Sequence, residues 1–409
     1  MGIFSEAAAV PGNKNWEVLT GRNEQLDPRQ DDVRSPFARD YTRILHSRGY
    51  RRMKHKTQVF FNIDKDHICT RMEHVSHVES VSGTIAGYLG LNTELTKAIS
   101  IGHDIGHAPF GHQGERVLDK ISQKYLNERF WHEKNGLHFV DDVELLADSY
   151  NEKRNLRLTY AVRDGIISHC GELDQNGLHP REDLIDLSEF CEPGQFQPAT
   201  WEGCVVKIAD KIAYVGRDIE DAISLGFIDD EGRQQLLKLA RANDQRVMNT
   251  TVIMYNLISD ICENSSPERG ICLSEKFSRQ LDEIKEFNIR YIYRNKRFMP
   301  YQDYSELVIR QIFESLYDLY DAEKIWENLR KEKAYRPDTM ESFEGWLAEY
   351  CEKDFVPEGN LKARANASIN RKIYGRLETE EQYVRAIIDY ISGMTDRFAI
   401  KVFNELLKY

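Results

Sequence analysis

Apolar residues recur every three or four positions along most of the chain, the spacing that places them on one face of an α-helix. The first clear run begins after Glu73 and ends at Gly90, a residue that favours helix termini. Asn92 follows, and its side chain is expected to cap a second helix over residues 93–103. A third helical pattern covers residues 115–126. This part of the chain is therefore predicted to be helical.

The same period returns downstream, most clearly over residues 201–225. Three segments of the last third share it: residues 276–293, 304–321 and 380–407. One short stretch differs, because residues 58–63 resemble a strand and residues 68–70 would return after a turn at Asp64-Lys65-Asp66. The predicted fold class is mostly α, with room for one small β-hairpin.

The length and composition bound the class of protein. A chain of 409 residues exceeds what one ordinary core can use, so more than one region is expected. With 41% hydrophobic and 30% charged residues, the chain is typical of soluble globular proteins. It has no membrane-length apolar run and no secretory-signal pattern at the N-terminus. Seven scattered cysteines without a C-x-x-C pair favour a reducing compartment, so a cytoplasmic protein is expected.

The charge is uneven along the chain. A formal net charge of −12 predicts a surface that repels polyanions. Residues 34–56 are the exception, with eight Arg and Lys residues against the single acid Asp40. Such a run can be a solvated helix face. It can also be a local cluster that attracts a phosphate-bearing molecule, with Arg51, Arg52, Lys54 and Lys56 as the candidate contacts.

Histidines are concentrated in one part of the sequence, since eight of the twelve lie between residues 67 and 138. A lone histidine on a helix is usually structural, but His103 and Asp104 are adjacent, so both can turn toward one cation. His74 and Asp210, on an earlier and a later predicted helix, are candidates to complete the ligand set. Nitrogen and oxygen donors of this kind suit Mn²⁺, Mg²⁺ or Fe²⁺.

A polar stripe surrounds one of these candidates. Asp210, Tyr214 and Asp218 are spaced four residues apart and Asp221 follows, so they share one helix face. The stripe can be the solvent side of a surface helix. The flanking sequence CVVKIADKIAYV is apolar enough that both faces can instead be packed. A buried carboxylate would then need a partner such as a metal ion.

Taken in order, Arg71-Met-Glu-His74, His103-Asp104 and Asp210 resemble the H…HD…D signature of the HD-domain metal-dependent phosphohydrolases. More narrowly, five blocks are similar to the deoxynucleoside triphosphate (dNTP) triphosphohydrolases of the dGTPase-like family: SPFARDYTRILHSRGYRRMKHKTQVF, RMEHVSHVESV, GHDIGHAPFGHQGE, KIADKIAYVGRDIEDA and DYISGMTDRFA. They cover nearly the whole chain. The resemblance implies a helical HD-domain core with additional C-terminal helices. The expected parts are an N-terminal basic segment packed on the core, an HD catalytic core and a C-terminal helical region, over residues 1–60, 61–235 and 236–409.

The resemblance also implies roles for individual residues, by their positions in these motifs. The expected metal ligands are His74, His103, Asp104 and Asp210. The expected catalytic residues are His112 and Glu115, beside the scissile phosphate, and His107. The expected substrate-binding residues are Arg71, Lys211 and His132 at the phosphates and Gln58, Tyr214 and Asp218 around the deoxyribose. The i, i+3 spacing of His112 and Glu115 would let the carboxylate orient the ring for proton transfer.

The activity that the resemblance implies is metal-dependent hydrolysis of dGTP, and of other dNTPs, to a deoxynucleoside and inorganic triphosphate. An HD-type phosphohydrolase acting on nucleoside monophosphates or a phosphodiester is the alternative. A protein that senses nucleic acid or nucleotides through a degenerate site is a third. Relatives form tetramers or hexamers, so a homo-oligomer is expected. Some relatives respond to an allosteric nucleotide or to single-stranded DNA. Neither these effects nor the base preference is decided by a residue of this sequence.

Overall fold

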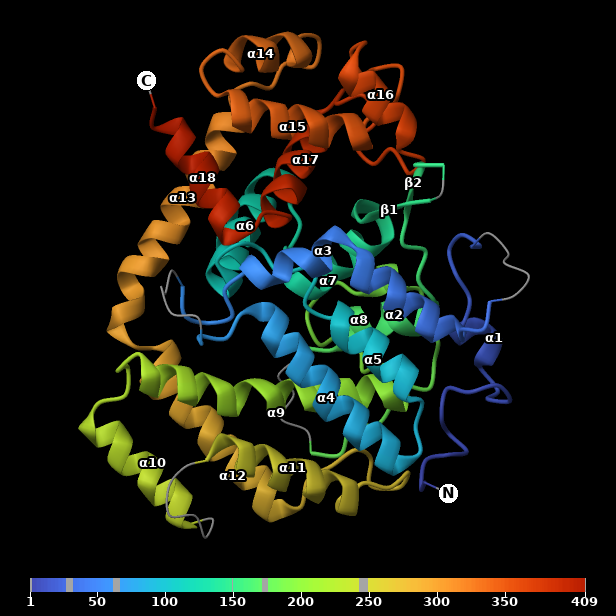
Figure 1. The fold of residues 1–409 in the computed structure, drawn as a ribbon, viewed down its shortest axis with the longest axis vertical. Helices are drawn as coiled ribbons and strands as arrows, with labels where there is room; N and C mark the ends of the chain where they lie inside the picture. Colours follow the sequence, from blue (N-terminus) through green and yellow to red (C-terminus); the bar gives the residue numbers. More distant parts are fainter. Residues whose placement is uncertain are drawn as a thin grey trace. The chain divides into compact units, whose positions relative to one another are not determined.

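Helices make up nearly all of the regular structure (Figure 1). The computed structural model describes residues 2–26, 32–61, 67–148, 150–170, 176–242 and 249–408. Within them lie eighteen α-helices and a single two-stranded sheet, which confirms the predicted mostly α fold. None of the described helices has the length and apolar character that a membrane crossing requires. The chain divides into two compact units, each assembled from three segments.

Unit 1 comprises Met1–Ile44, Gln58–Asp104 and Leu158–Tyr301. Its elements are α1 (Trp16–Leu19), most of α2 (Pro36–His46), α4 (Arg71–Leu89), α5 (Thr93–Gly102), α8 (Tyr160–Ser168), η3 (Leu187–Glu189), α9 (Trp201–Ser224), α10 (Asp230–Ala242), α11 (Thr250–Asn264), α12 (Glu275–Asn288), η4 (Ile289–Tyr293) and η5 (Lys296–Phe298). Helices α4, α5 and α9 contact one another at its centre. Figure 1 shows α4 crossing α9, with α11 and α12 running beside α9.

Helix α4 ends at Gly90 and α5 begins after Asn92 as the sequence predicts, whereas α4 begins at Arg71, earlier than the predicted start. Thr70 and Glu73 form a capping box at the start of α4, in which each side chain accepts a hydrogen bond from the other's backbone N–H. Gly90 ends this helix in the left-handed conformation, with φ of 81°. The side chain of Asn92 accepts hydrogen bonds from the first-turn amides of α5, so the predicted cap is confirmed. These caps fix the ends of the two helices that carry the first three predicted metal ligands.

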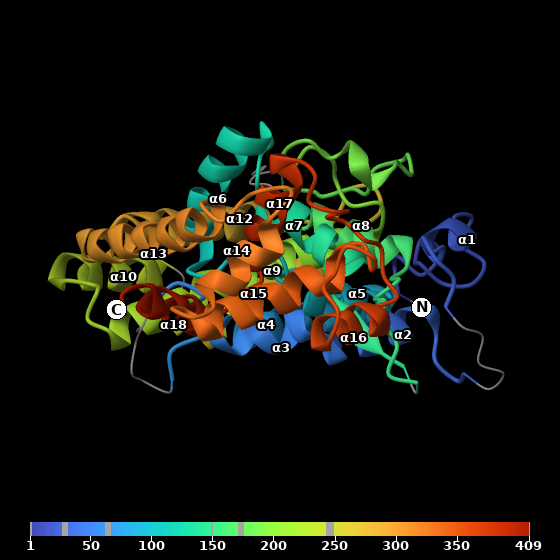
Figure 2. The same cartoon turned by 90° about the horizontal axis from the view of Figure 1, so that it is seen from above.

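Unit 2 comprises Leu45–Thr57, Ile105–Arg157 and Gln302–Tyr409. Its elements are α3 (Arg48–Arg52), η1 (Met53–His55), α6 (Gly111–Leu126), α7 (His132–His138), η2 (Phe139–Val143), β1 (Leu145–Ala147), β2 (Lys153–Asn155), most of α13 (Met299–Tyr317), α14 (Ile325–Glu332), α15 (Pro337–Tyr350), α16 (Asn360–Ala367), α17 (Glu380–Ser392) and α18 (Asp396–Leu406). Helix α15 contacts α14, α16, α17 and α18, and α17 also packs on α6. Figures 1 and 2 both show α14 and α16 beside α15.

The predicted hairpin is not found where the sequence placed it. Residues 58–61 and 68–70 belong to no strand, and residues 62–66, which include the Asp64-Lys65-Asp66 turn, lie outside the described residues. The strand-like composition instead reflects aromatic packing, because the Phe60 ring lies 4.9 Å from that of Phe227. The sheet that the structure contains pairs β1 with β2 in antiparallel register.

Two of the predicted C-terminal helices are interrupted. Residues 276–293 form α12 followed by one π-helical turn, η4. Residues 380–407 form α17 and α18, because the side chain of Thr395 caps a new helix by accepting a hydrogen bond from the Phe398 N–H. The expected division at residues 60 and 235 stays a prediction.

Candidate active site

The four predicted metal ligands lie together in unit 1, and we call them the metal cluster. His74 is on α4, His103 caps the C-terminus of α5, Asp104 follows it and Asp210 is on α9. His74 Nε2 lies 2.9 Å from Asp210 Oδ1, and His103 Nε2 lies 3.4 Å from Asp104 Oδ1. His103 Nε2 is also 3.8 Å from Asp210 Oδ1. Because α4, α5 and α9 contact one another, the four side chains with potential metal-ligand atoms lie around one point.

The surroundings of His103 make one ring nitrogen available for a cation. Its Nδ1 lies 2.6 Å from the carbonyl oxygen of Ser100, and because a carbonyl only accepts, Nδ1 carries the proton. The other nitrogen, Nε2, is buried without a hydrogen-bond partner among the described residues. Histidines that bind metals usually donate their second ring N–H to a carbonyl or carboxylate in this way. A buried hydrogen-bond acceptor without a partner lowers the stability of the folded protein, so a cation bound to Nε2 would stabilise the site.

The charge of the metal cluster also fits a divalent cation. Two imidazoles supply nitrogen donors and two carboxylates supply oxygen donors with two negative charges. Burial raises the pKa of Asp210, but the hydrogen bond and charge of His74 and the charge of His103 outweigh it and bring the pKa to about 2. Burial lowers the pKa of His74, and the neighbouring carboxylates Asp210 and Asp104 overcome it and raise the pKa. Asp210 is therefore an ionised acceptor at neutral pH.

Arg71, predicted to bind phosphate, is the first residue of α4 and is buried. Its Nη1 donates a hydrogen bond to Asp104 Oδ2 at 2.7 Å. The guanidinium therefore fixes one oxygen of Asp104 and adds positive charge beside the metal cluster. A contact with phosphate stays a prediction.

The polar stripe on α9 is packed against protein, so the surface-helix interpretation is wrong. Asp218 and Asp221 are 2% and 4% exposed. The Tyr293 hydroxyl donates a hydrogen bond to Asp218 Oδ2 at 2.5 Å. Burial raises the pKa of Asp218 to about 7. Lys211 and Tyr214 are half-buried on the same helix.

Gln58 precedes α4 in unit 1. Its Oε1 is buried and has no hydrogen-bond partner among the described residues. An amide oxygen in this state can accept a hydrogen bond from a ligand hydroxyl. No hydrogen bond joins Gln58 to the metal cluster within the described part of unit 1, so its place at the sugar stays a prediction.

The structure adds His169, which the sequence analysis does not single out. Its ring lies 4.9 Å from that of His103. One of its ring nitrogens lies within 4.8 Å of a ring nitrogen of His103 and of a carboxylate oxygen of Asp104. Its Nδ1 lies 2.7 Å from the Ile166 carbonyl oxygen, which repeats the arrangement of His103. The sequence signal is only a histidine directly after the apolar helix α8, a pattern that is usually structural.

In unit 2, the structure brings together His107, His112, Glu115 and His132, which we call the histidine cluster. Glu115 Oε2 lies 3.2 Å from Nδ1 of both His112 and His132. The His107 and His132 rings stack with centroids 3.8 Å apart. Burial raises the pKa of Glu115, but the charge of His132 and the hydrogen bond with His112 hold that pKa well below its usual range. The side chain of His112 is 68% exposed, whereas His107 and His132 are buried.

Two glycines, one in the loop before α6 and one in the first turn of α6, shape the segment that carries His107, His112 and Glu115. A Cβ on Gly106 would lie 2.1 Å from the His132 carbonyl oxygen, so only glycine lets the loop pack against α7. A Cβ on Gly114 would lie 1.9 Å from the Pro109 carbonyl oxygen. Between them Phe110 adopts a left-handed conformation with φ of 65°. Two of the four glycines of GHDIGHAPFGHQGE, Gly106 and Gly114, are thus required by close backbone approach.

The basic segment is used partly for structure. Lys56 is buried, and its Nζ donates hydrogen bonds to the carbonyl oxygens of His107 and Ser392. Arg52 forms an ion pair with the buried carboxylate of Glu144. These two cations therefore hold unit 2 together, and Lys56 fixes the backbone of the histidine cluster.

Comparison with known families identifies the class of protein that contains this site. The chain matches the HD domain over residues 71–215 and the phosphohydrolase-associated domain over residues 359–405. The first match contains the metal cluster and the histidine cluster entirely. The protein is therefore a phosphohydrolase with an HD domain.

Relatives that match nearly the whole chain define its family within this class. The chain is 31% identical over 399 residues to a deoxyguanosinetriphosphate triphosphohydrolase-like protein of Clostridium tetani, covering 97% of this chain and 92% of the relative. It is 29% identical over 387 residues to a protein of the same name from Caldanaerobacter subterraneus subsp. tengcongensis, covering 94% and 88%. The chain belongs to the dGTP triphosphohydrolase-like family, which confirms the resemblance seen in its motifs.

Proposed function

We propose that this protein hydrolyses dNTPs, dGTP among them, to a deoxynucleoside and inorganic triphosphate. The observation that carries the proposal is the metal cluster, where two imidazoles and two carboxylates meet and His103 Nε2 is buried without a partner among the described residues. The printed names of the relatives support dGTP as one substrate. In the overall reaction, the oxygen of water bonds to the α-phosphorus and the bond between that phosphorus and O5′ breaks. The deoxynucleoside leaves with a proton on O5′, and the water oxygen stays on the inorganic triphosphate.

We expect His74, His103, Asp104 and Asp210 to hold a divalent cation, either Mn²⁺, Mg²⁺ or Fe²⁺. Such an ion, when bound, acidifies a water molecule and neutralises charge on phosphoryl oxygens. The low pKa of Asp210 keeps this ligand ionised, and Arg71 orients Asp104. His169 is added as a candidate contact of the same site, because its ring nitrogens are arranged as those of His103 are.

The histidine cluster supports a role in proton transfer. Glu115 faces Nδ1 of both His112 and His132, so it orients the two rings and leaves their Nε2 atoms directed elsewhere. We expect His112, the exposed ring, to give a proton to O5′ as the deoxynucleoside leaves. We expect the stacked rings of His107 and His132 to donate hydrogen bonds to phosphate oxygens.

Sugar recognition is assigned to α9. We expect Asp218 to accept a hydrogen bond from the 3′-hydroxyl and Tyr214 to pack against C2′, where it would exclude a ribose hydroxyl. Gln58 and Lys211 would complete the contacts to sugar and phosphate. The burial of Asp218 and the unpaired Oε1 of Gln58 among the described residues support these roles.

The test is incubation with each of the four dNTPs and Mn²⁺, followed by ion-exchange separation of the products. Release of intact triphosphate with a deoxynucleoside is the expected result, whereas release of phosphate or diphosphate would contradict the proposal. Comparing dGTP with GTP tests the sugar contacts, and equal rates would refute them. If no single dNTP is consumed, the mixture of four and added single-stranded DNA test for an activating ligand. Turnover of a monophosphate or phosphodiester alone would replace the proposal.

Assembly and location remain expectations of the same proposal. We expect a homo-oligomer, a tetramer or hexamer, and its native mass can be measured by light scattering. All seven cysteines are free of disulfides, which supports work in a reducing compartment such as the cytoplasm.

A further inference from the structure

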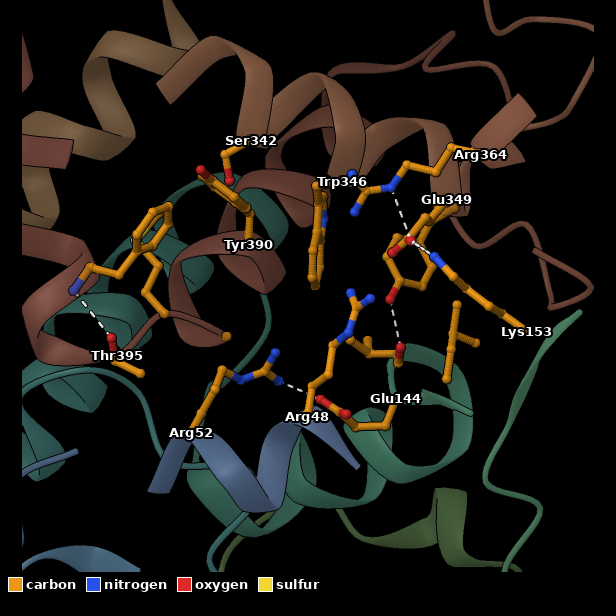
Figure 3. A pocket seen from close by; sticks show the side chains of 16 residues that line it. Arg48, Arg52, Glu144, Lys153, Ser342, Trp346, Glu349, Arg364, Tyr390 and Thr395 are labelled. Atoms are coloured by element: carbon orange, nitrogen blue, oxygen red, sulfur yellow. Dashed lines mark hydrogen bonds and ion pairs between the residues drawn. The ribbon is translucent and has the colours of Figure 1, made fainter. Parts of the chain in front are cut away.

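A cavity of about 320 Å³ lies within unit 2 and is lined by no residue of the metal cluster or the histidine cluster. Its walls come from α3, the segment from η2 to β2, and the helices α15 to α18. Figure 3 shows the side chains of these elements gathered around one space. Pockets for small ligands have volumes of roughly 300–1,000 Å³. The cavity therefore suits one small molecule and not a macromolecule.

The walls carry an excess of positive charge. The charged lining residues are Arg48, Arg52, Lys153 and Arg364 against Glu144 and Glu349. Lys153 Nζ and Arg364 Nε lie 2.6 and 3.0 Å from the same oxygen, Oε1 of Glu349. Two positive charges thus stay unbalanced, in a chain with a net charge of −12. A ligand with two negative charges would balance them.

Two arginines of α3 have donors that the protein does not use. Arg48 makes no hydrogen bond or ion pair with any described residue, and it extends from α3 toward Trp346 (Figure 3). Nε of Arg52 is buried without a hydrogen-bond partner in the described chain, although its guanidinium pairs with Glu144. A guanidinium binds a phosphate through two parallel N–H···O bonds, which suits donors placed in this way.

The remaining wall is aromatic and rigidly held. Trp346 lies 4.8 Å from the ring of Tyr350 and 5.9 Å from that of Tyr390, and all three line the cavity. The indole N–H of Trp346 donates to the Tyr374 hydroxyl at 3.1 Å, and this hydroxyl donates to Asp389 at 2.9 Å. These bonds fix the indole before any ligand arrives. A fixed indole favours binding of a planar ring by stacking.

We propose that this cavity, the Arg48 pocket, binds a phosphate monoester that carries a planar aromatic ring. The dianionic phosphate meets the free guanidinium of Arg48 and the Nε of Arg52, and the ring lies against Trp346. A monocarboxylate would leave one positive charge unbalanced, and a nucleic acid would exceed the volume. The assignment does not depend on the proposed catalytic reaction, since no lining residue takes part in it.

The test is calorimetric titration of the full-length protein with nucleoside 5′-monophosphates as probes. Arg48→Gln removes an exposed guanidinium and should weaken binding by about tenfold or more. Lys54→Gln is the matched control, because Lys54 is an exposed cation of η1 that does not line the cavity. Its dissociation constant should stay within about twofold of the wild-type value.

Two further kinds of probe test the contributions of the aromatic ring and of the phosphate separately. Ribose 5-phosphate lacks the ring and should bind at least about tenfold more weakly than the mononucleotides. The unphosphorylated nucleosides should show no binding that depends on Arg48. Equal affinity of the wild-type protein and Arg48→Gln for every mononucleotide would overturn the proposal, because binding at the metal cluster alone would give that result. Equal affinity for ribose 5-phosphate and the mononucleotides would refute the aromatic contact.

Discussion

The metal cluster and the histidine cluster combine imidazoles and carboxylates in different proportions, two to two in the first and three to one in the second. In the metal cluster, two histidines and two aspartates converge, and burial covers all four side chains almost completely. In the histidine cluster, three histidines surround the single carboxylate of Glu115, and the His112 ring is largely exposed. The negative charge of two buried carboxylates attracts a cation. An excess of imidazoles around one carboxylate can instead offer protons to an anion.

The hydrogen bonds of the two clusters support the same distinction. In the metal cluster, a backbone carbonyl holds the Nδ1 proton of His103 and leaves Nε2 as an acceptor. In the histidine cluster, a carboxylate holds Nδ1 of His112. A carbonyl fixes a neutral ring, whereas a carboxylate also stabilises a protonated ring. The first arrangement suits a metal ligand and the second suits a proton donor.

The strongest test of this distinction is Asp210→Asn. Loss of a charged ligand should remove the metal and lower turnover to that of the metal-stripped protein, since even residues behind metal ligands contribute about 10–100-fold. Metal content by mass spectrometry and the rate of dNTP hydrolysis should fall together. Asp183→Asn, at an exposed loop position, is the matched control and should change neither. Full metal content in Asp210→Asn would refute its role as a ligand.

His112→Ala tests the other half of the comparison. Removal of the exposed ring should cut turnover by roughly 10²-fold or more while the metal content stays at the wild-type level. The same two measurements made on Asp210→Asn apply here. His46→Ala, which removes another exposed histidine, should leave both unchanged. If His112→Ala lost the metal with the activity, the two clusters would not have separate roles.

Glu115→Gln should have a smaller effect, because it weakens the orientation of His112 without removing the ring. We expect turnover to fall by about tenfold with little change in KM, since the interaction is used mainly in the transition state. Steady-state kinetics with dGTP would measure both quantities. A loss larger than that of His112→Ala would mean that Glu115 contacts the reacting groups itself.

The sequence predicts the helices better than their contacts. Apolar spacing before Gly90 predicted α4 because that spacing reflects burial on one face. Aromatic residues around Phe60 suggested a strand, but their composition serves ring packing within unit 1. The start of α18 was missed because the helical period of residues 380–407 continues through the cap at Thr395.

For the candidate site, too, the sequence predicts the residues better than their contacts. Ordered motifs identified the residues of both clusters, and the structure brings each set together. His169 was not predicted, because its proximity to His103 depends on the packing of α8 against α5. Lys56 was seen as a positive charge, but the carbonyl groups that it binds lie 51 and 336 residues away in the sequence. Tertiary contacts of this kind leave no local pattern.

Asp218→Asn has the smallest expected effect on the rate and also affects stability. Because burial raises the pKa of Asp218 to about 7, the folded protein holds a proton that the unfolded chain releases near pH 4. The wild-type protein therefore loses stability between about pH 4 and 7, and a neutral asparagine avoids this loss. We therefore compare the unfolding free energies of Asp218→Asn and the wild-type protein at each pH. The difference in favour of the variant should be about 1–4 kcal/mol larger at pH 8 than at pH 4.

The same substitution should raise KM for dNTPs by about tenfold, because asparagine is a weaker acceptor for the 3′-hydroxyl than a carboxylate. Denaturant unfolding at the two pH values and KM measurements with dGTP separate the two effects. A rise in KM without a gain in stability would mean that Asp218 is ionised at little cost in the folded protein. A gain in stability without a change in KM would place the sugar contact elsewhere on α9. The second outcome would show that a buried carboxylate near the metal cluster is not by itself evidence of a role in binding.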